Sequence, residues 1–169
     1  MAQMKLRQLV YAALLLALAL VFQSLRFLIP IPPVFTTFLI GSLVNSCIFL
    51  AVDTAGLTGA IVIAAVTPVM AYVQQLLLVP LFILPVAAGN SLLAILYWLL
   101  RKRLFWVKIG VAAAGKCLLM YVGFSLLLSM VAIPEQAAKA ILFIMSWPQL
   151  VTAVLGGLIS QAVNKRLLS

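Results

Sequence analysis

The chain has 169 residues, of which 67% are hydrophobic and 8% are charged, and it carries a formal net charge of +9. A soluble domain of this composition would lack the polar side chains that cover a surface in water, so we expect the chain to be solvated by lipid. Nucleic-acid binding explains the positive charge poorly, because the basic residues stand at the ends of apolar stretches and are not interleaved with aromatic residues. Membrane topology explains it better, with some affinity for anionic headgroups as a by-product.

Six apolar stretches are long enough to cross a bilayer as helices, since about 20 mainly apolar residues span the hydrocarbon core. The first is too long for a cleaved signal peptide and lacks a cleavage-site pattern. The second is short, as a slightly tilted or partly re-entrant segment would be. We therefore predict an all-α membrane protein with a single domain over residues 1–169, whose spans run approximately over residues 9–29, 34–51, 54–77, 81–100, 107–131 and 139–164.

The positions of the 11 basic residues test this number of spans, because Lys and Arg near span ends collect on the cytoplasmic side. If both termini are cytoplasmic, Arg26 and Lys139 lie outside and Lys116 lies within the fifth span. The other eight all fall at cytoplasmic ends of spans: Lys5, Arg7, Arg101, Lys102, Arg103, Lys108, Lys165 and Arg166. This bias predicts six spans with the N and C termini in the cytoplasm.

Two apolar, proline-containing segments connect spans on the outer side, residues 26–33 (RFLIPIPP) and residues 74–80 (QQLLLVP). Proline restricts each segment to turn or extended backbone. A stiff apolar segment at the outer surface could pack over a cavity as a lid. The alternative is that these prolines merely terminate helices.

Small residues recur at four-residue spacing in three of the predicted spans, and such spacing lets helix backbones approach closely. In the third span they are Gly56, Ala60 and Ala64, and in the sixth they include Ala153 and Gly157. We expect internal packing for these two spans. Cys47 and Cys117 also fall within apolar spans and are expected to be small core residues.

Three polar residues of the last three spans are expected at a similar depth in the membrane. With a helix rise of about 1.5 Å per residue, Asn90 lies about 14 Å and Gln149 about 15 Å below the outer ends of their spans. Lys116 lies about 22 Å below the outer end of the fifth span by the same rise. Asn90, Lys116 and Gln149 are therefore predicted near the middle of the bilayer, where they could line one polar cavity.

Lys116 is the most informative of the three, because a lysine at that depth must find a counter-charge, lose its proton or meet water. The only acidic residues are Asp53, near the inner surface, and Glu135, in an outer loop, and neither is well placed as a partner. An anionic ligand would supply the missing charge, with Asn90 and Gln149 fixing its orientation through hydrogen bonds. The alternative is that Lys116 snorkels along its stem toward the cytoplasmic headgroups.

Three further residues are candidates for the same site. Trp147 lies inside the sixth span and could stack on a flat ligand, and Gln74 and Gln75 stand at the outer end of the third span. Pro148, next to Trp147, frees a backbone carbonyl one turn earlier, which is common beside membrane binding sites. The predicted substrate-binding set is therefore Asn90, Lys116, Gln149, Trp147, Gln74 and Gln75.

The sequence lacks the residue combinations that catalysis needs. It has no histidine, no paired carboxylates and no cysteine couple, so we expect no enzymatic activity, no metal and no cofactor. A nucleotide-binding loop is absent, and so is the carboxylate within a span that ion-coupled pumping usually requires. The chain can therefore bind a molecule in the membrane but shows no means of powering its movement.

The chain resembles the S component, the substrate-binding subunit, of energy-coupling factor (ECF) transporters. The resemblance rests on span number, size and orientation, on Ala13 and Ala17 of an AxxxA pattern in the first span, and on Gly89-Asn90, Gly115-Lys116 and the run from Gln149 to Gly157. It implies a six-helix bundle in a bacterial cell membrane that binds a vitamin-like micronutrient. Because of Lys116, we expect this micronutrient to carry an anionic group. It also implies docking through Ala13 and Ala17 onto a transmembrane coupling subunit driven by two ATPases, and closure of the site by the outer loops.

Two other functional classes stay open at this point. An autonomous secondary transporter or small channel would be expected to show a carboxylate in a span or an inverted repeat, and neither is visible. In a non-transporting membrane scaffold, Lys116 would merely snorkel. Co-purification with a coupling subunit and ATPases distinguishes the S component from both.

Overall fold

The computed structural model describes residues 2–28, 32–131 and 133–167, and over these ranges the chain forms helices joined by short turns. Six stretches are long and apolar enough to span a membrane, as the sequence predicts. The helices are α1 (Ala2–Ser24), α2 (Pro33–Thr54), α3 (Gly56–Val73), α4 (Ile83–Leu99), α5 (Phe105–Met130), α6 (Glu135–Ile144) and α7 (Trp147–Leu167), with 3-10 turns η1 (Leu25–Phe27) and η2 (Pro80–Phe82).

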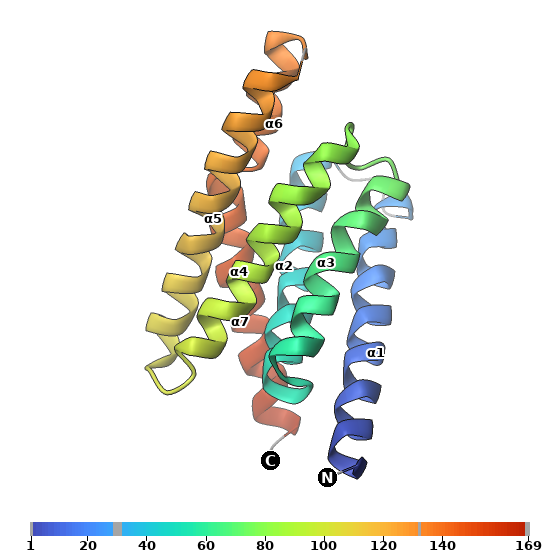
Figure 1. The fold of residues 1–169 in the computed structure, drawn as a ribbon, viewed down its shortest axis with the longest axis vertical. Coiled ribbons are helices and arrows are strands. Elements are labelled where there is room, and N and C mark those ends of the chain that lie inside the picture. Colours follow the sequence, from blue (N-terminus) through green and yellow to red (C-terminus); the bar gives the residue numbers. More distant parts are fainter. Residues whose placement is uncertain (1, 29–31, 132, 168–169) are drawn as a thin grey trace.

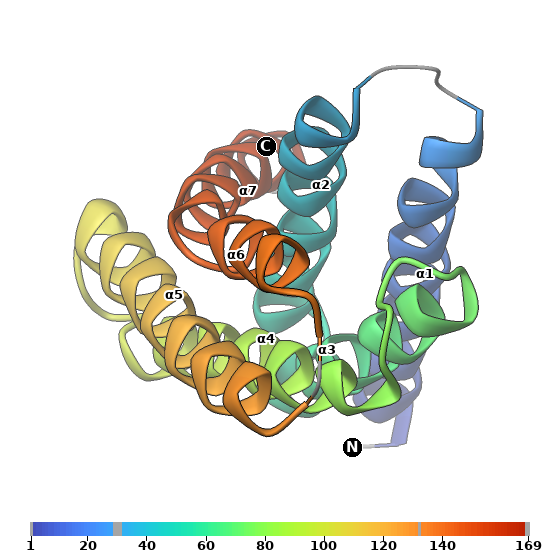
Figure 2. The same cartoon turned by 90° about the horizontal axis from the view of Figure 1, so that it is seen from above.

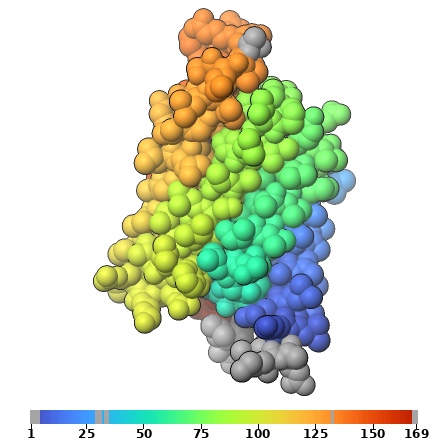
Figure 3. Space-filling model, in the orientation of Figure 1, coloured from blue at the N-terminus to red at the C-terminus, as the bar shows by residue number. Residues whose placement is uncertain are grey.

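The helices stand side by side, and both termini lie at the same end of the bundle (Figure 1). This is the end that carries the basic clusters, so we refer to it as the cytoplasmic end. Viewed along the bundle, α2 and α7 lie on one side and α4 and α5 on the other, with α1 and α3 next to each other (Figure 2). The outer part of α5 projects with α6 beyond the other helices, which the space-filling view also shows in orange (Figure 3).

The second span is a full helix of 22 residues and not a short or re-entrant segment. Pro33 opens it at a first-turn position, where the missing N–H costs no hydrogen bond. At its other end α3 follows almost directly, because Gly56 adopts a φ of +80°, a left-handed conformation that glycine reaches without strain. The predicted span ends at residue 51 because the charged Asp53 follows closely, whereas the helical backbone continues to Thr54.

The sixth stretch differs most from the prediction, because it is two helices and not one. α6 ends at Ile144, and α7 begins at Trp147 after a turn at Met145 and Ser146. Pro148 explains the break: its ring lacks an N–H and clashes with the carbonyl four residues earlier, which is that of Ile144. The side chain of Gln149 donates to this freed carbonyl, with Nε2 3.3 Å from the oxygen.

Small residues allow the helices to approach closely, as predicted for the third and sixth spans. Ala60, Ala64 and Ala153 are fully buried. Gly156 of α7 faces α2 so closely that an added Cβ would lie 2.7 Å from the Ser42 carbonyl oxygen. α2 is consequently held against α7 along the middle of the bundle, which places polar residues of both helices in contact.

Candidate ligand cavity

A cavity of about 320 Å³ lies among the helices, and its wall is mostly apolar. Aliphatic residues, methionines and the ring of Phe82 form much of the wall. Its polar lining residues come from six of the seven helices and from η1: Gln23, Arg26, Thr37, Asn45, Thr67, Asn90, Lys116 and Gln149. The three residues for which the sequence predicted a similar depth, Asn90, Lys116 and Gln149, thus line one cavity.

Lys116 enters the cavity from α5 and is only 3% exposed. Its Nζ donates to Oδ1 of Asn45 on α2 at 2.7 Å. The Asn45 amide is oriented in turn by its Nδ2, which donates to Oγ1 of Thr152 on α7 at 3.2 Å. Lys116 therefore turns into the bundle toward α2, and it does not snorkel to the cytoplasmic headgroups.

The positive charge of Lys116 is not balanced by a carboxylate of the chain. Asp53 accepts hydrogen bonds from the Tyr97 hydroxyl at 3.1 Å and from Asn164 Nδ2 at 2.6 Å. Glu135 pairs with Lys139 at 2.6 Å on the exposed side of α6. These two are the only acidic residues in the sequence. An ammonium group has three N–H donors, and Asn45 accepts one of them.

Besides Lys116 and Asn45, a second set of polar side chains, Gln23 and Arg26, lines the cavity at the outer end of α1. Gln23 Nε2 donates to the Thr67 carbonyl on α3 at 3.0 Å. Two buried atoms beside it, Oε1 of Gln23 and Nε of Arg26, have no hydrogen-bond partner among the described residues. A buried polar atom without a partner is costly, so these two atoms mark a place where a ligand or water is expected.

Asn45, Gln23 and Arg26 were not among the predicted site residues. The sequence places Arg26 in the outer loop because it follows the first apolar stretch, yet it lines the cavity together with Gln23. The three-residue spacing of Gln23 and Arg26, which places them on one face of a helix, was the available signal. Asn45 is a polar residue within the second predicted span, which was the available signal for it. No sequence pattern connects it to Lys116.

Three predicted site residues lie outside the cavity lining. Gln74 donates from Nε2 to the Ser24 hydroxyl at 3.2 Å. Gln75 is exposed in the turn after α3, with a φ of 58°. The ring of Trp147 is 49% exposed and lies between Phe38 and Phe143, with ring centroids 5.8 Å and 5.6 Å away.

The segments at the outer end contribute apolar residues to the cavity wall. Leu76, Leu77 and Leu78 come from the predicted lid between the third and fourth spans. In the other predicted lid, residues 29–31 lie outside the described residues. Ile141, Ile144 and Met145 line the cavity from α6 and the turn that follows it. The lid function of these segments stays a prediction.

Fold and cavity together define a multi-pass membrane protein with an internal chamber that carries two cationic side chains. The family model of the ECF transporter substrate-specific component matches residues 7–168, and the chain belongs to this family. The family is a transporter component and not an enzyme family. Neither a curated protein nor a solved structure matches the chain significantly.

Proposed function

We propose that the chain is the substrate-binding subunit of an ECF-type ABC importer. It captures a vitamin or related micronutrient with an anionic group from outside and passes it to a coupling module driven by two ATPases. The observation that carries the anionic part of this proposal is the burial of Lys116 in the cavity without a carboxylate partner.

An anionic ligand completes this site for an electrostatic reason. A buried charge that lacks a counter-charge is costly in the membrane, and a ligand carboxylate or phosphate provides both the charge and the hydrogen-bond acceptors. Asn45 holds one ammonium N–H at 2.7 Å and leaves the others for the ligand. Arg26, which also lines the cavity, adds a second positive charge, and together the two cations attract anions to the chamber.

The rest of the wall suits a small and largely aliphatic ligand body. A volume of about 320 Å³ is at the lower end of the range for ligand pockets. Phe82 is the one aromatic residue among the lining residues, so the wall offers little for stacking on a flat ring system. We expect Asn90 and Gln149, which also line the cavity, to hydrogen-bond polar groups along the ligand.

The coupling partner is expected to contact α1. Ala13 and Ala17 are exposed on this helix, one turn apart, and small residues at that spacing let a second helix approach closely. Large apolar residues of the same helix, including Leu14 and Leu18, are also exposed. An exposed apolar helix with small residues fits a membrane-embedded protein partner, which would supply the driving force that this chain lacks.

The ligand is tested by extracting the small molecules retained by the protein after mild purification and identifying them by mass spectrometry. We expect one molecule per protein that carries a carboxylate or phosphate at neutral pH. Retention of a neutral or cationic molecule would contradict the anionic assignment, even if the importer function holds.

Partner docking is tested separately with co-expressed coupling subunit and ATPases. Replacing Ala13 and Ala17 by leucine is expected to reduce co-purification by about tenfold or more, because bulky side chains hold the two helices apart. The control exchanges two exposed alanines of other helices, Ala88 on α4 and Ala114 on α5, for leucine. Equal losses in both double variants, or none in either, would argue against docking at α1.

A further inference from the structure

A second cavity lies at the cytoplasmic end of the bundle and is not part of the ligand site. It has a volume of about 480 Å³. Its lining comes from α4, α7 and the region where α5 begins: Tyr97, Arg103, Phe105, Lys108, Gln161, Asn164 and Lys165. Three of these seven residues are cationic and none is acidic. We call this group the basic pocket.

Lys108 is partly buried and is held in the basic pocket by contacts with Tyr97. Its Nζ donates to the Tyr97 hydroxyl at 2.8 Å and lies 4.3 Å from the centre of the Tyr97 ring. A lysine that served topology alone would gain most by hydrating its ammonium group at the membrane surface. Holding the charge against a buried tyrosine requires an organised site, because Tyr97 is only 2% exposed.

A hydrogen-bond network fixes the other side of the basic pocket. Tyr97 donates to Asp53 at 3.1 Å, and Asn164 of α7 donates to the same carboxylate oxygen at 2.6 Å. Asp53 thus holds Tyr97 and Asn164 in position and offsets the positive charge of one of the three basic residues of the pocket. Arg103 and Lys165 are exposed among the pocket residues, so the pocket as a whole remains positively charged.

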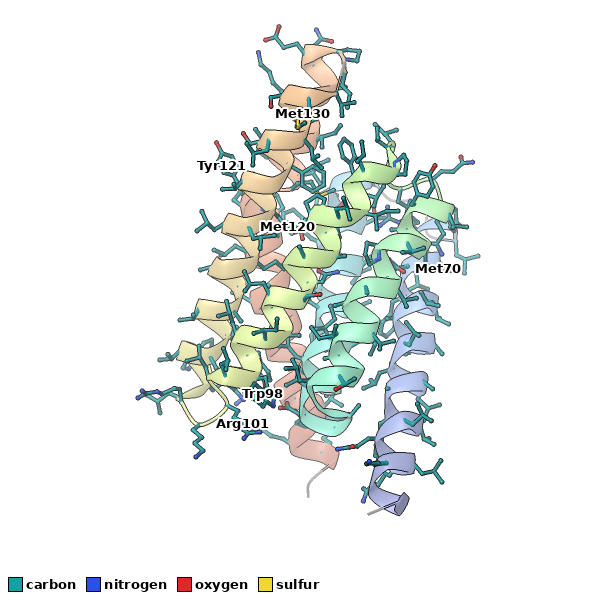
Figure 4. All side chains as sticks on the ribbon, viewed as in Figure 1. Met70, Trp98, Arg101, Met120, Tyr121 and Met130 are labelled. Carbon is teal, nitrogen blue, oxygen red and sulfur yellow. The ribbon has the colours of Figure 1, made fainter. Side chains whose placement is uncertain are left out.

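Aromatic residues next to the pocket residues indicate the depth of the lipid headgroups. Trp98 follows Tyr97 and Trp106 follows Phe105 in the sequence, and Trp106 is 67% exposed, as expected at a membrane interface. Arg101 stacks on Trp98, with Cζ 5.0 Å from the ring centre. Figure 4 shows Trp98 and Arg101 together at the cytoplasmic end of the bundle.

We propose that the basic pocket binds the phosphodiester headgroup of an anionic phospholipid in the cytoplasmic leaflet. Arg103 provides a guanidinium fork for phosphate oxygens, and Lys108 and Lys165 provide ammonium groups. Basic pockets between membrane helices on the cytoplasmic side are the sites that favour such headgroups. This inference does not depend on the ligand of the outer cavity or on docking at α1.

The test uses the purified chain in a neutral detergent, with lipid binding measured by native mass spectrometry. We expect phosphatidylglycerol to bind at least about tenfold more tightly than phosphatidylcholine. Since each basic residue near an anionic headgroup contributes roughly fivefold, exchanging Arg103, Lys108 and Lys165 for glutamine should remove this preference. Arg103→Gln alone removes one exposed charge without touching the Tyr97 network, and it should weaken phosphatidylglycerol binding about fivefold.

The matched control removes three other cytoplasmic charges, with Lys5, Arg101 and Lys102 exchanged for glutamine. None of these three lines the pocket, so the preference for phosphatidylglycerol should stay within about twofold of the original. Equal losses in the control and the pocket variants would overturn the proposal, because a diffuse positive surface would then explain the binding. Equal binding of both lipids by the unmodified chain would overturn it as well.

Two further experiments distinguish the phospholipid from two other occupants of the pocket, free phosphate and a protein partner. Inorganic phosphate is expected to displace phosphatidylglycerol only at concentrations far above that of the lipid, and displacement at equal concentration would assign the pocket to free phosphate. With co-expressed coupling subunit and ATPases, the pocket variants are expected to co-purify as the unmodified chain does. Loss of that association with unchanged lipid binding would make the pocket a protein contact and overturn the lipid assignment.

Discussion

Two lysines of α5, Lys108 and Lys116, show how one helix treats the same residue type in two environments. Lys108 lies at the cytoplasmic end, where the Tyr97 hydroxyl accepts its hydrogen bond and in turn donates to Asp53. Lys116 lies two turns further along, buried beside Asn45, with both carboxylates of the chain engaged elsewhere. A carboxylate of the chain lies one residue away from the first charge, through Tyr97, whereas none accompanies the second.

Burial of a lysine therefore does not by itself mark the ligand site. Lys108 is also partly buried, but Tyr97 and Asp53 lie beside it at the cytoplasmic end, where the proposed partner is a lipid headgroup and not the transported ligand. At Lys116 the protein supplies orientation through Asn45 and Thr152 but no negative charge. The following substitutions separate these two situations, beginning with the largest expected effect.

Lys116→Met keeps the length and the apolar stem of the side chain and removes the charge. We expect loss of ligand affinity by a factor of about 100 or more, because removing one partner of a buried charge pair costs roughly 2–5 kcal/mol. The measurement is the amount of retained small molecule per mole of protein. Lys108→Met is the matched control and should retain the ligand within about twofold of the original.

Asn45→Leu removes the acceptor that orients Lys116 and is close to asparagine in size. We expect ligand affinity to fall by about tenfold, since a hydrogen bond to a charged group contributes roughly 1.5–3 kcal/mol. In a double-mutant cycle with Lys116→Met the two losses should be strongly non-additive. Additive losses would show that Asn45 acts on the ligand without going through Lys116.

Arg26→Gln tests the second cation of the cavity, which lies near the outer end of α1. We expect slower ligand capture, by about threefold to tenfold, with a smaller change in the release rate, because a charge at the outer end of the bundle acts mainly on encounter. The effect should shrink as the salt concentration rises. Stopped-flow binding at two ionic strengths would check this, and Lys139→Gln on α6 provides a control for outer positive charge.

Tyr97→Phe breaks the link between Lys108 and Asp53 while leaving the ring in place. The expected effect is the smallest: stability falls by about 1 kcal/mol, the usual contribution of a hydrogen bond, and ligand affinity stays unchanged. Thermal unfolding in detergent and ligand retention measure the two quantities. A drop in affinity comparable to that of Asn45→Leu would mean that the two lysines are coupled and that the comparison fails.

The fold was largely predictable because lipid imposes simple rules on sequence. Apolar length set the six spans, and the distribution of Lys and Arg placed both termini at one end. The break between α6 and α7 was missed, although Pro148 and the carbonyl that it frees were visible in the sequence. A freed carbonyl is compatible with a kinked helix as well as with a break, and only the surrounding packing decides between them.

The site was predictable in depth but not in rotation or pairing. Helical rise predicted Asn90, Lys116 and Gln149 near the middle of the bilayer, and they line one cavity. Asn45 and Thr152 are 107 residues apart, and no local pattern indicates that α2 and α7 bring them together. Trp147 was placed inward by its depth, whereas it lies beside Phe38 and Phe143 and does not line the cavity.

We infer that the cavity is a cationic chamber in which Lys116 lacks a carboxylate partner, and charge-selective thiol labelling tests this charge without knowledge of the ligand. Val86 lines the cavity on α4, one turn from Asn90, so Val86→Cys places a thiol there. Cys47 and Cys117 are first exchanged for alanine. The rates of modification by an anionic and a cationic methanethiosulfonate, added from outside, are compared after correction for their reactivity with a free thiol.

We predict that the anionic reagent reacts about tenfold faster, because a cationic cleft with low-dielectric walls concentrates anions. Lys116→Met should remove most of this preference, and Lys108→Met should leave it unchanged. Equal rates for the two reagents, or a preference that Lys116→Met leaves undiminished, would contradict this assignment.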